Sequence, residues 1–377
     1  MAYIPFNRPF IVGKELIYIQ QAVSNWHLSG NGPFTKKCHT WLEEQVGCCK
    51  ALLTHSGTAA LEMAAILADI EPGDEIIMPS YTFVSTANAF VLRGGVPVFA
   101  EIRPDTLNLD ESRIEPAITP RTRAIVAVHY AGVACEMDAI MAIAERNNLL
   151  VIEDAAHGLM STYRRRPLGS IGHLAAVSFH ETKNVMCGEG GALLINDPRW
   201  IERAEIIWEK GTNRSQFFRG EIDKYSWIDV GSSYLPSEIN AAFLFAQLEE
   251  AQSIAPRRLR IWRQYHGGFA QLEAQGKVRR PVIPSEFQHN AHMYYLLLPD
   301  RECRTTLIDK LKASGVNAVF HYIPLHSSPA GRKYGRAHGD LSRTEAASDC
   351  LIRLPLWVEM TEEDVKQVIT GVHEALD

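Results

Sequence analysis

The stretch Leu149-Leu-Val-Ile-Glu-Asp-Ala-Ala-His157 decides the fold. Its first four residues are apolar with no polar residue between them, which predicts a strand buried on both faces. Asp154 follows after Glu153, so we expect its carboxylate at the carboxyl end of this strand. Ligands of open parallel sheets bind at that edge. The residues alone leave open whether Asp154 caps the next helix or binds a ring nitrogen or a metal.

Similar apolar runs lie on both sides of this stretch and alternate with helical patterns. Apolar residues recur at helical spacing in the segments 58–69, 84–92 and 136–147. The predicted strands are 51–53, 75–78, 96–99, 124–128, 149–153, 175–179 and 191–195. Strands that alternate with helices predict an α/β domain with a mainly parallel sheet.

The pattern of predicted helices and strands changes in the last third of the chain. A long helical pattern runs from about Ser237 toward Leu272, despite a proline at position 256, and predicts a bridge to a second, smaller domain. The elements expected there are strands at 293–298 and 317–322 and helices at 305–314 and 362–376. We therefore predict a large domain of residues 1–245 and a small α+β domain of residues 246–377.

Composition excludes several classes of protein. The chain has 377 residues, of which 46% are hydrophobic and 22% charged, as in ordinary globular proteins. Its net charge of −6 argues against a nucleic-acid partner. The sequence has no signal peptide, no apolar stretch near the roughly 18 residues of a membrane span, and no cysteine–histidine cluster with metal-ligand spacing. We expect a cytoplasmic protein without a membrane partner or a metal.

Two further motifs indicate a ligand site when they are considered together with Asp154. Ser56-Gly-Thr-Ala59 stands where a strand leads into a helix, so it is either an anion-binding helix terminus or an ordinary helix start. Lys183 ends the motif Ser178-Phe-His-Glu-Thr-Lys183, and most lysines in such places are solvated surface charges. A phosphate cradle, a carboxylate at a strand end and a lysine are together the parts that hold pyridoxal 5′-phosphate.

Over essentially its whole length the sequence resembles the DegT/DnrJ/EryC1/StrS family of sugar aminotransferases. The motifs that carry the resemblance are Asn7-Arg-Pro, Pro79-Ser-Tyr-Thr-Phe-Val-Ser-Thr-Ala-Asn88, Glu153-Asp-Ala-Ala-His157, Ser178-Phe-His-Glu-Thr-Lys183 and Gly188-Glu-Gly-Gly191. The resemblance implies the fold-type I architecture of pyridoxal-phosphate enzymes. It also implies at least a homodimer, because such cofactor sites usually include residues of a neighbouring subunit.

The resemblance implies a role for each matching residue. Lys183 matches the lysine that binds the cofactor covalently and moves protons, and Asp154 matches the partner of the pyridine nitrogen. His157 matches the position that contacts the ring hydroxyl. Phe83 matches the aromatic residue that stacks on the ring, with Tyr81 as the alternative. The implied phosphate-binding residues are Gly57, Thr58 and Ser178.

Other candidates are expected to contact the substrate or a second subunit. Many family members carry an asparagine that reaches the phosphate of the neighbouring subunit's cofactor, and here Ser233, with a shorter reach, aligns best with it. Arg214 and Arg219 lie in a polar loop over 211–233; they are either pyrophosphate-binding forks or solvated surface charges. Candidates for the sugar pocket, or else packed residues at a strand end, are His321, Tyr322 and His326.

The reaction that the resemblance implies has two substrates. An amino group moves from L-glutamate to C4 of dTDP-4-keto-6-deoxy-D-glucose, which gives 2-oxoglutarate and dTDP-4-amino-4,6-dideoxy-D-galactose. The similarity to members with this activity lies in 129–138, 210–220, 229–235 and 320–326. A sibling enzyme for another keto-sugar position or nucleotide, or a non-catalytic regulator that binds the cofactor, are the alternatives. Related sugar 3-dehydratases have histidine in place of Lys183, which argues against that class.

Overall fold

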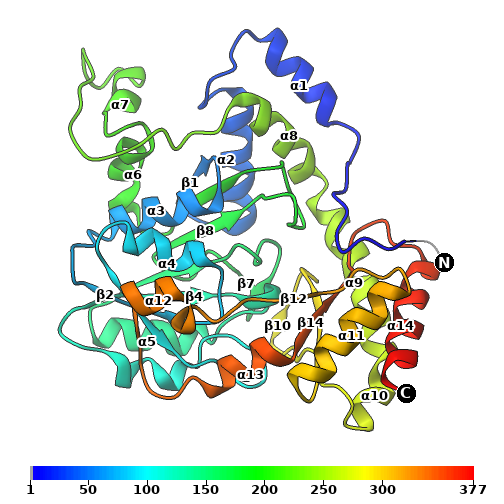
Figure 1. Ribbon diagram of the computed structural model, residues 1–377. Helices are drawn as coiled ribbons and strands as arrows, with labels where there is room; N and C mark the ends of the chain where they lie inside the picture. The colour runs from blue at the N-terminus through cyan, green and yellow to red at the C-terminus, as the bar shows by residue number, and fades with distance from the viewer. Residues whose placement is uncertain (1–2) are drawn as a thin grey trace.

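The structure, a computed structural model, describes residues 3–377 and is built on an eight-stranded central sheet (Figure 1). In their order of pairing, the strands are β1 (Lys50–Thr54), β9 (Gly191–Ile195), β8 (Leu174–Ser178), β5 (Leu150–Asp154), β4 (Thr122–Val128), β2 (Glu75–Pro79), β3 (Val96–Ala100) and β13 (Arg336–Ala337). All neighbouring pairs are parallel except those of β9, which is antiparallel to β1 and to β8. The expected α/β class and mainly parallel sheet are therefore confirmed.

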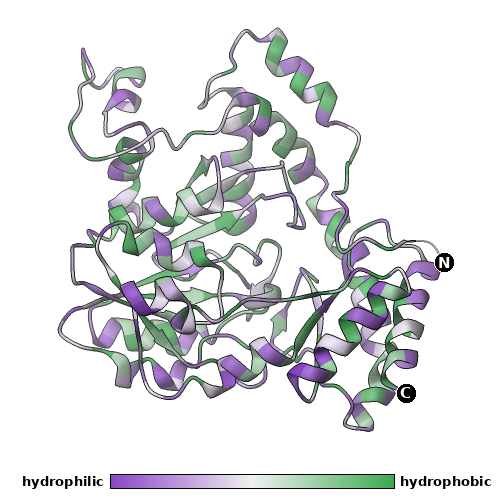
Figure 2. Cartoon of the chain, in the orientation of Figure 1, coloured by the Kyte–Doolittle hydropathy of each residue, from purple (hydrophilic) through white to green (hydrophobic). Residues whose placement is uncertain are grey.

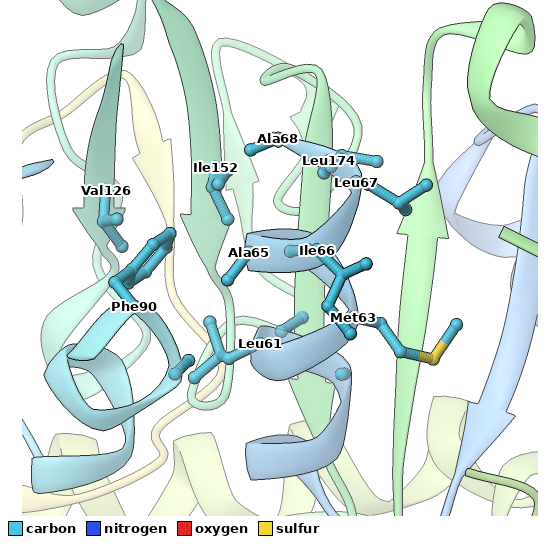
Figure 3. Packing of buried hydrophobic residues seen from close by; sticks show 14 of the residues in the cluster. Leu61, Met63, Ala65, Ile66, Leu67, Ala68, Phe90, Val126, Ile152 and Leu174 are labelled. Carbon is cyan, nitrogen blue, oxygen red and sulfur yellow. The ribbon is translucent and has the colours of Figure 1, made fainter. Parts of the chain in front are cut away.

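Both faces of the sheet are buried, which explains its uninterrupted apolar sequences. Ile152 packs under α3 (Gly57–Leu67) and α4 (Val84–Val91), whereas Val151, its neighbour on β5, faces α5 (Met137–Arg146) on the other side. Figure 3 shows the apolar side chains of α3 directed toward those of β4, β5 and β8. Burial of each such side chain stabilises the fold by roughly 1.5–3 kcal/mol.

A layer of helices covers the β1 end of the sheet, and its two N-terminal members are absent from the predictions. It consists of α1 (Glu15–Ser24), α2 (Pro33–Val46) and α8 (Glu238–Glu249). The buried carboxylate of Glu238 accepts the N–H groups of Phe34 and Thr35, at 2.8 and 2.9 Å, and so satisfies the first turn of α2. A negative charge there also complements the helix dipole.

A second, antiparallel sheet of three strands lies beside the central sheet (Figure 1). Its strands are β11 (Tyr294–Leu297), β14 (Leu351–Leu354) and β12 (Val319–Phe320). The helices that pack on it are α9 (Ala251–Gly268), α11 (Arg301–Ala313) and α14 (Glu362–Leu376). The strand predicted over 317–322 is thus reduced to two residues, because the chain turns into the cavity described below.

The helical pattern that starts near Ser237 is not one helix. It forms α8, α9 and the short α10 (Ala270–Ala274), with breaks at Glu250 and Phe269. Pro256 lies inside α9 and does not end it. The predicted boundary between residues 245 and 246 falls within α8, and the division into these domains stays a prediction.

After β12 the chain returns to the central sheet through α12 (Pro329–Tyr334), β13 and α13 (Ser342–Cys350). Arg336 of β13 donates Nε–H and NH2 hydrogen bonds to the carboxylate of Glu75, at 3.1 and 2.8 Å. This contact fixes the edge strand β13, and with it the segment that leads there from the second sheet.

Smaller elements complete the structure. Residues of the predicted polar loop at 211–233 form a short helix, α7 (Arg214–Phe218), that extends away from the sheet (Figure 1). The remaining strands are β6 (Thr162–Tyr163), β7 (Arg166–Pro167) and β10 (Phe287–Gln288), and the remaining helices are α6 (Ile201–Trp208) and the 3₁₀ turns Glu111–Arg113, Glu115–Ala117, Tyr130–Gly132, Pro198–Trp200 and Leu325–Ser327. Hydrophilic residues recur along the outer helices (Figure 2), and within residues 3–377 none has the length and apolarity to cross a membrane.

Candidate active site

A cavity of about 870 Å³ opens at the carboxyl ends of β4, β5 and β8. One wall is formed by the strand ends of the central sheet and by the start of α3. The opposite wall is formed by residues of β12 and β14 and of the segment that follows β12. The cavity therefore lies where the topology of an open parallel sheet predicts a ligand.

Asp154, the last residue of β5, lines the cavity and is held in one orientation. The Thr86 hydroxyl donates a hydrogen bond to its Oδ2 at 2.7 Å, and the Ala156 N–H donates to its Oδ1 at 3.2 Å. Thr86 in turn lies 2.8 Å from the hydroxyl of Thr82. The carboxylate is buried and has no ion-pair partner within 4 Å among residues 3–377, so it can serve a cationic group in the cavity.

Lys183 enters the cavity from the loop after β8. Burial lowers the pKa of its amine to about 8, against a smaller rise caused by the charge of Asp154. The residue after Lys183 anchors this loop: the side-chain amide of Asn184 donates a hydrogen bond to the carbonyl of Asn290 at 2.8 Å. A lysine with a pKa near neutrality is a competent nucleophile and proton carrier.

The start of α3 forms a cradle that fits a phosphate group. Ser56 caps the helix by accepting the Ala59 N–H at 3.1 Å, and the hydroxyls of Thr58 and Ser85 lie 2.7 Å apart. A Cβ on Gly57 would lie 3.0 Å from Cβ of Ser178, closer than ordinary van der Waals contact, so glycine allows the start of α3 to approach β8 closely. Backbone N–H groups, hydroxyls and the helix dipole thus converge on one point of the cavity.

His157 presents an unsatisfied atom to the same cavity. Its ring stacks on that of His292 with centroids 4.1 Å apart, and its buried Nδ1 has no hydrogen-bond partner among residues 3–377. Burial, followed by the charges of Lys183 and Arg353, holds the pKa of His157 well below its usual range, so the ring is neutral. A buried polar atom without a partner is costly, and a ligand hydroxyl beside it would satisfy it.

The two aromatic candidates differ in position. Phe83 precedes α4, lines the cavity and is 56% exposed, so its ring is available to a ligand. Tyr81 is fully buried below it, and its hydroxyl donates to the carbonyl of His321 at 3.2 Å. Of the two, Phe83 is the residue that the structure places beside the cavity.

The predicted sugar-binding residues are only partly brought together. His321 and Tyr322 line the cavity with their rings stacked 3.6 Å apart, and His321 Nδ1 lies 2.7 Å from the hydroxyl of Tyr130. Tyr322 has a φ of +32°, a strained value for a residue with a side chain. His326 is not among the lining residues, since its ring lies 2.7 Å from Ser80 Oγ and 3.3 Å from a carboxylate oxygen of Glu345.

Three other candidates lie outside the cavity lining. Arg219 donates to Glu205 and Glu221, at 2.6 and 2.7 Å. Arg214 contacts neighbouring aromatic rings of its own loop, and Ser233 is exposed. Their assignment to a pyrophosphate or to a neighbouring subunit stays a prediction.

The structure also adds cavity residues that sequence reasoning missed. Ser85 and Thr86 belong to the quoted motif 79–88, where hydroxyls follow the aromatic residue. Arg353 lies on β14 of the second sheet, and His292 lies in the segment that leads into β11. Arg353 carried a usable signal, since it interrupts the apolar run Leu351-Ile-Arg-Leu-Pro-Leu356.

Comparisons with known proteins agree with this geometry. A model of the DegT/DnrJ/EryC1/StrS aminotransferase family matches residues 11–373. The spore coat polysaccharide biosynthesis protein SpsC of Bacillus subtilis is 32% identical over 99% of this chain and 97% of its own. The crystal structure of DesV from S. venezuelae is 29% identical, with a TM-score of 0.90 over 100% of this chain and 99% of DesV. The PLP form of Spr1654 from Streptococcus pneumoniae is 25% identical, with a TM-score of 0.91 over 100% of both chains.

Proposed function

The chain belongs to the DegT/DnrJ/EryC1/StrS aminotransferase family, and from that premise we propose that it transfers the amino group of L-glutamate to C4 of dTDP-4-keto-6-deoxy-D-glucose. The protein is a sugar aminotransferase with the fold-type I architecture, and its cofactor is pyridoxal 5′-phosphate. The choice of substrates rests on the similarity of 129–138, 210–220, 229–235 and 320–326 to the dTDP-4-amino-4,6-dideoxygalactose transaminase of enterobacterial common antigen synthesis.

The observation that carries the proposal is the convergence of Lys183, Asp154 and the α3 cradle on one cavity. Pyridoxal 5′-phosphate supplies an aldehyde that condenses with amines and a protonated ring that delocalises the electron pair of a broken C–H bond. In our assignment, Gly57, Thr58 and Ser178 hold its phosphate. Asp154, oriented by Thr86, holds the proton on the pyridine nitrogen.

Lys183 is assigned both covalent attachment and proton transfer. With a pKa of about 8, its amine is neutral at pH 7 roughly 300 times more often than that of an ordinary lysine. The Nζ atom accepts the proton from the α-carbon of the donor, and in the second half-reaction it delivers a proton to C4 of the sugar. When the cofactor is bound, His157, whose Nδ1 lacks a partner within the described chain, would contact the ring hydroxyl, and Phe83 would cover the ring.

The remaining candidates are assigned to substrate and subunit contacts. We place the sugar against His321 and Tyr322, with His326 fixing the segment that carries them to Ser80. Because Ser233, Arg214 and Arg219 do not line the cavity of their own chain, we assign them to the site of a neighbouring subunit in a homodimer. Size-exclusion chromatography with light scattering measures this assembly, and a monomer would contradict the assignment.

Absorption spectroscopy of the cofactor-loaded protein tests the reaction. We expect a yellow band that L-glutamate bleaches and that dTDP-4-keto-6-deoxy-D-glucose restores, with formation of the 4-amino sugar detected by mass spectrometry. If only another keto sugar restores the band, the enzyme is a sibling of the proposed one. If no amino acid bleaches it, the non-catalytic alternative replaces the proposal.

A further inference from the structure

The segment 290–292, which leads into β11, contacts the wall of the cavity that carries the cofactor candidates. Its first residue, Asn290, is 2% exposed. The Nδ2 atom of this side chain donates to the carbonyls of His157 and Leu159, at 2.7 and 2.8 Å, and these residues lie 133 and 131 positions away along the chain. Its Oδ1 accepts the N–H of His292 at 3.0 Å. A buried amide whose hydrogen bonds are all made across such a distance fixes two parts of the fold to each other.

Two neighbours keep this segment in place. Arg258 is buried, and it donates from Nε to the carbonyl of Ala291 at 3.1 Å and from NH2 to that of His292 at 2.8 Å. Gly132, with a φ of +80°, lies against the amide of Asn290, and a Cβ on this glycine would overlap Oδ1 of the amide. The segment is therefore a rigid support, held by hydrogen bonds on one side and by close packing on the other.

The segment holds His157 at two points. The amide of Asn290 fixes the main chain of His157, and the ring of His292 stacks on its ring with centroids 4.1 Å apart. The main-chain bond sets where the side chain starts, and the stacked ring limits how it rotates. The direction of the unpaired Nδ1 of His157, the atom assigned to the cofactor hydroxyl, therefore depends on this segment.

The same segment holds the loop of Lys183 through the next residue along the chain. Asn184 donates from Nδ2 to the main-chain carbonyl of Asn290 at 2.8 Å, and its Oδ1 lies 3.2 Å from Nδ1 of His292. Both ends of this side-chain amide thus contact the segment. Lys183 and His157 belong to different loops, after β8 and after β5, and the segment connects the two.

We propose that Asn290 is a positioning residue of the cofactor site: its side chain sets the position of His157, and its carbonyl holds the loop of Lys183. The inference rests on the roles assigned above to these two residues and deepens them, since it names what aligns them. Asn290 is not among the residues that line the cavity, so it acts through its neighbours. Loss of its amide should misalign the site without removing a group that touches the cofactor, and a displacement of about 1 Å can cost up to roughly 100-fold.

Cofactor binding to the full-length apoprotein tests the contact with His157. Pyridoxamine 5′-phosphate and its 3-deoxy analogue have no aldehyde to react with Lys183, so the ratio of their dissociation constants measures the hydroxyl contact alone. We expect the wild type to bind the form with the hydroxyl roughly 10-fold more tightly, and N290A to reduce this preference to less than about 3-fold. A purely structural role of Asn290 would weaken the binding of both ligands equally and leave the ratio unchanged.

Attachment of pyridoxal 5′-phosphate tests the contact with the Lys183 loop. N184A removes the hydrogen bond to the carbonyl of Asn290 and leaves the segment itself intact. We expect the rate at which the yellow band appears in the apoprotein to fall roughly 10-fold in N184A. The dissociation constant of pyridoxamine 5′-phosphate, which does not react with the lysine, should change less than about 3-fold in the same variant.

N196A is the matched control. Asn196 also donates from Nδ2 to two carbonyls, those of Gly169 and Gly172, at 3.0 and 2.7 Å. It follows β9, which runs antiparallel to β8, so it lies at the edge of the sheet opposite the cavity. N196A should lower the unfolding temperature, as N290A does, but leave the binding ratio and the attachment rate unchanged. If N290A does not fold, N290S replaces it, because serine can accept the His292 N–H but has a single proton to donate to two carbonyls.

Each outcome bears on the proposal. An unchanged binding ratio in N290A or an unchanged attachment rate in N184A overturns it, and so do equal effects in N196A, which would show a general loss of packing. A wild type that binds the 3-deoxy analogue equally well also overturns it, because His157 would then not contact the hydroxyl. None of these measurements uses an amino donor or a keto sugar, so they decide the role of Asn290 whichever substrates the enzyme takes. Failure of the proposed function appears separately, in the absorption assay with L-glutamate and the keto sugar.

Discussion

Replacing Glu75 with glutamine is expected to destabilise the protein by about 3 kcal/mol at pH 7. The Glu75 carboxylate is fully buried at the start of β2. Hydrogen bonds from Arg336, first of all, and from Thr119 and Arg121 hold its pKa at about 2, below its ordinary value of 4.5. Since each pKa unit corresponds to roughly 1.4 kcal/mol, the ionised carboxylate stabilises the fold by that amount.

The pH dependence of the effect has a definite sign. A carboxyl group with a lowered pKa in the folded state stabilises it fully above its unfolded pKa, here 4.5, and loses this stabilisation as the pH falls toward about 2. Urea unfolding at pH 7 and pH 3 measures the difference between wild type and E75Q. It should be about 2 kcal/mol smaller at pH 3. E71Q, which changes an exposed carboxylate nearby, is the control.

The same substitution has a consequence for the cavity. Arg336 ties β13 to the central sheet, and the chain between β12 and β13 carries Tyr322 and His326. E75Q should therefore raise the KM for the keto sugar while the glutamate half-reaction stays near its wild-type rate. An equal loss of stability at both pH values would refute the assignment of the stabilisation to the ionised carboxylate.

Four further outcomes concern the cofactor site. K183A should lose covalent attachment of the cofactor, so that borohydride treatment leaves the protein mass unchanged. D154N should lower kcat/KM by roughly 100-fold or more while the cofactor still binds, as steady-state kinetics and fluorescence titration will measure. G57A should weaken cofactor binding about 10-fold in the same titration, because the new Cβ lies 3.0 Å from Cβ of Ser178, whereas G267A, with no atom within 4 Å, should not. The rate of cofactor attachment to the apoprotein should rise with pH and level off above about pH 8, because only the neutral amine of Lys183 reacts; a rise that continues to pH 10 would contradict the lowered pKa.

The central sheet could be predicted from the sequence because its signal is local. Strands buried on both faces read as unbroken apolar runs, and β5 therefore placed Asp154 at the edge where ligands bind. The position of Lys183 after β8 followed in the same way. Helix α2 could not be predicted, since its start is satisfied by Glu238, which is 204 positions from Phe34.

The second wall of the cavity could not be predicted because it depends on pairing between distant segments. β14 lies between β11 and β12, and this order brings Arg353 beside Phe320 and into the lining of the cavity that Lys183 also lines. Within the sequence, Arg353 is merely a charge in an apolar run. The strained φ of Tyr322 likewise has no local signal, because it is held by contacts such as that of the Ser348 hydroxyl with its carbonyl, at 2.8 Å.

This difference between the two walls has a functional meaning. The wall built on the central sheet supplies the residues assigned to the cofactor, which every enzyme of the family must hold in the same way. The wall built on the second sheet supplies His321 and Tyr322, which we assign to the sugar. Substitutions on the first wall should therefore impair both half-reactions together, whereas those on the second should separate them. A substitution of Tyr322 should impair the keto-sugar half-reaction and leave the glutamate half-reaction near its wild-type rate, and a common defect in both would show that the second wall also holds the cofactor.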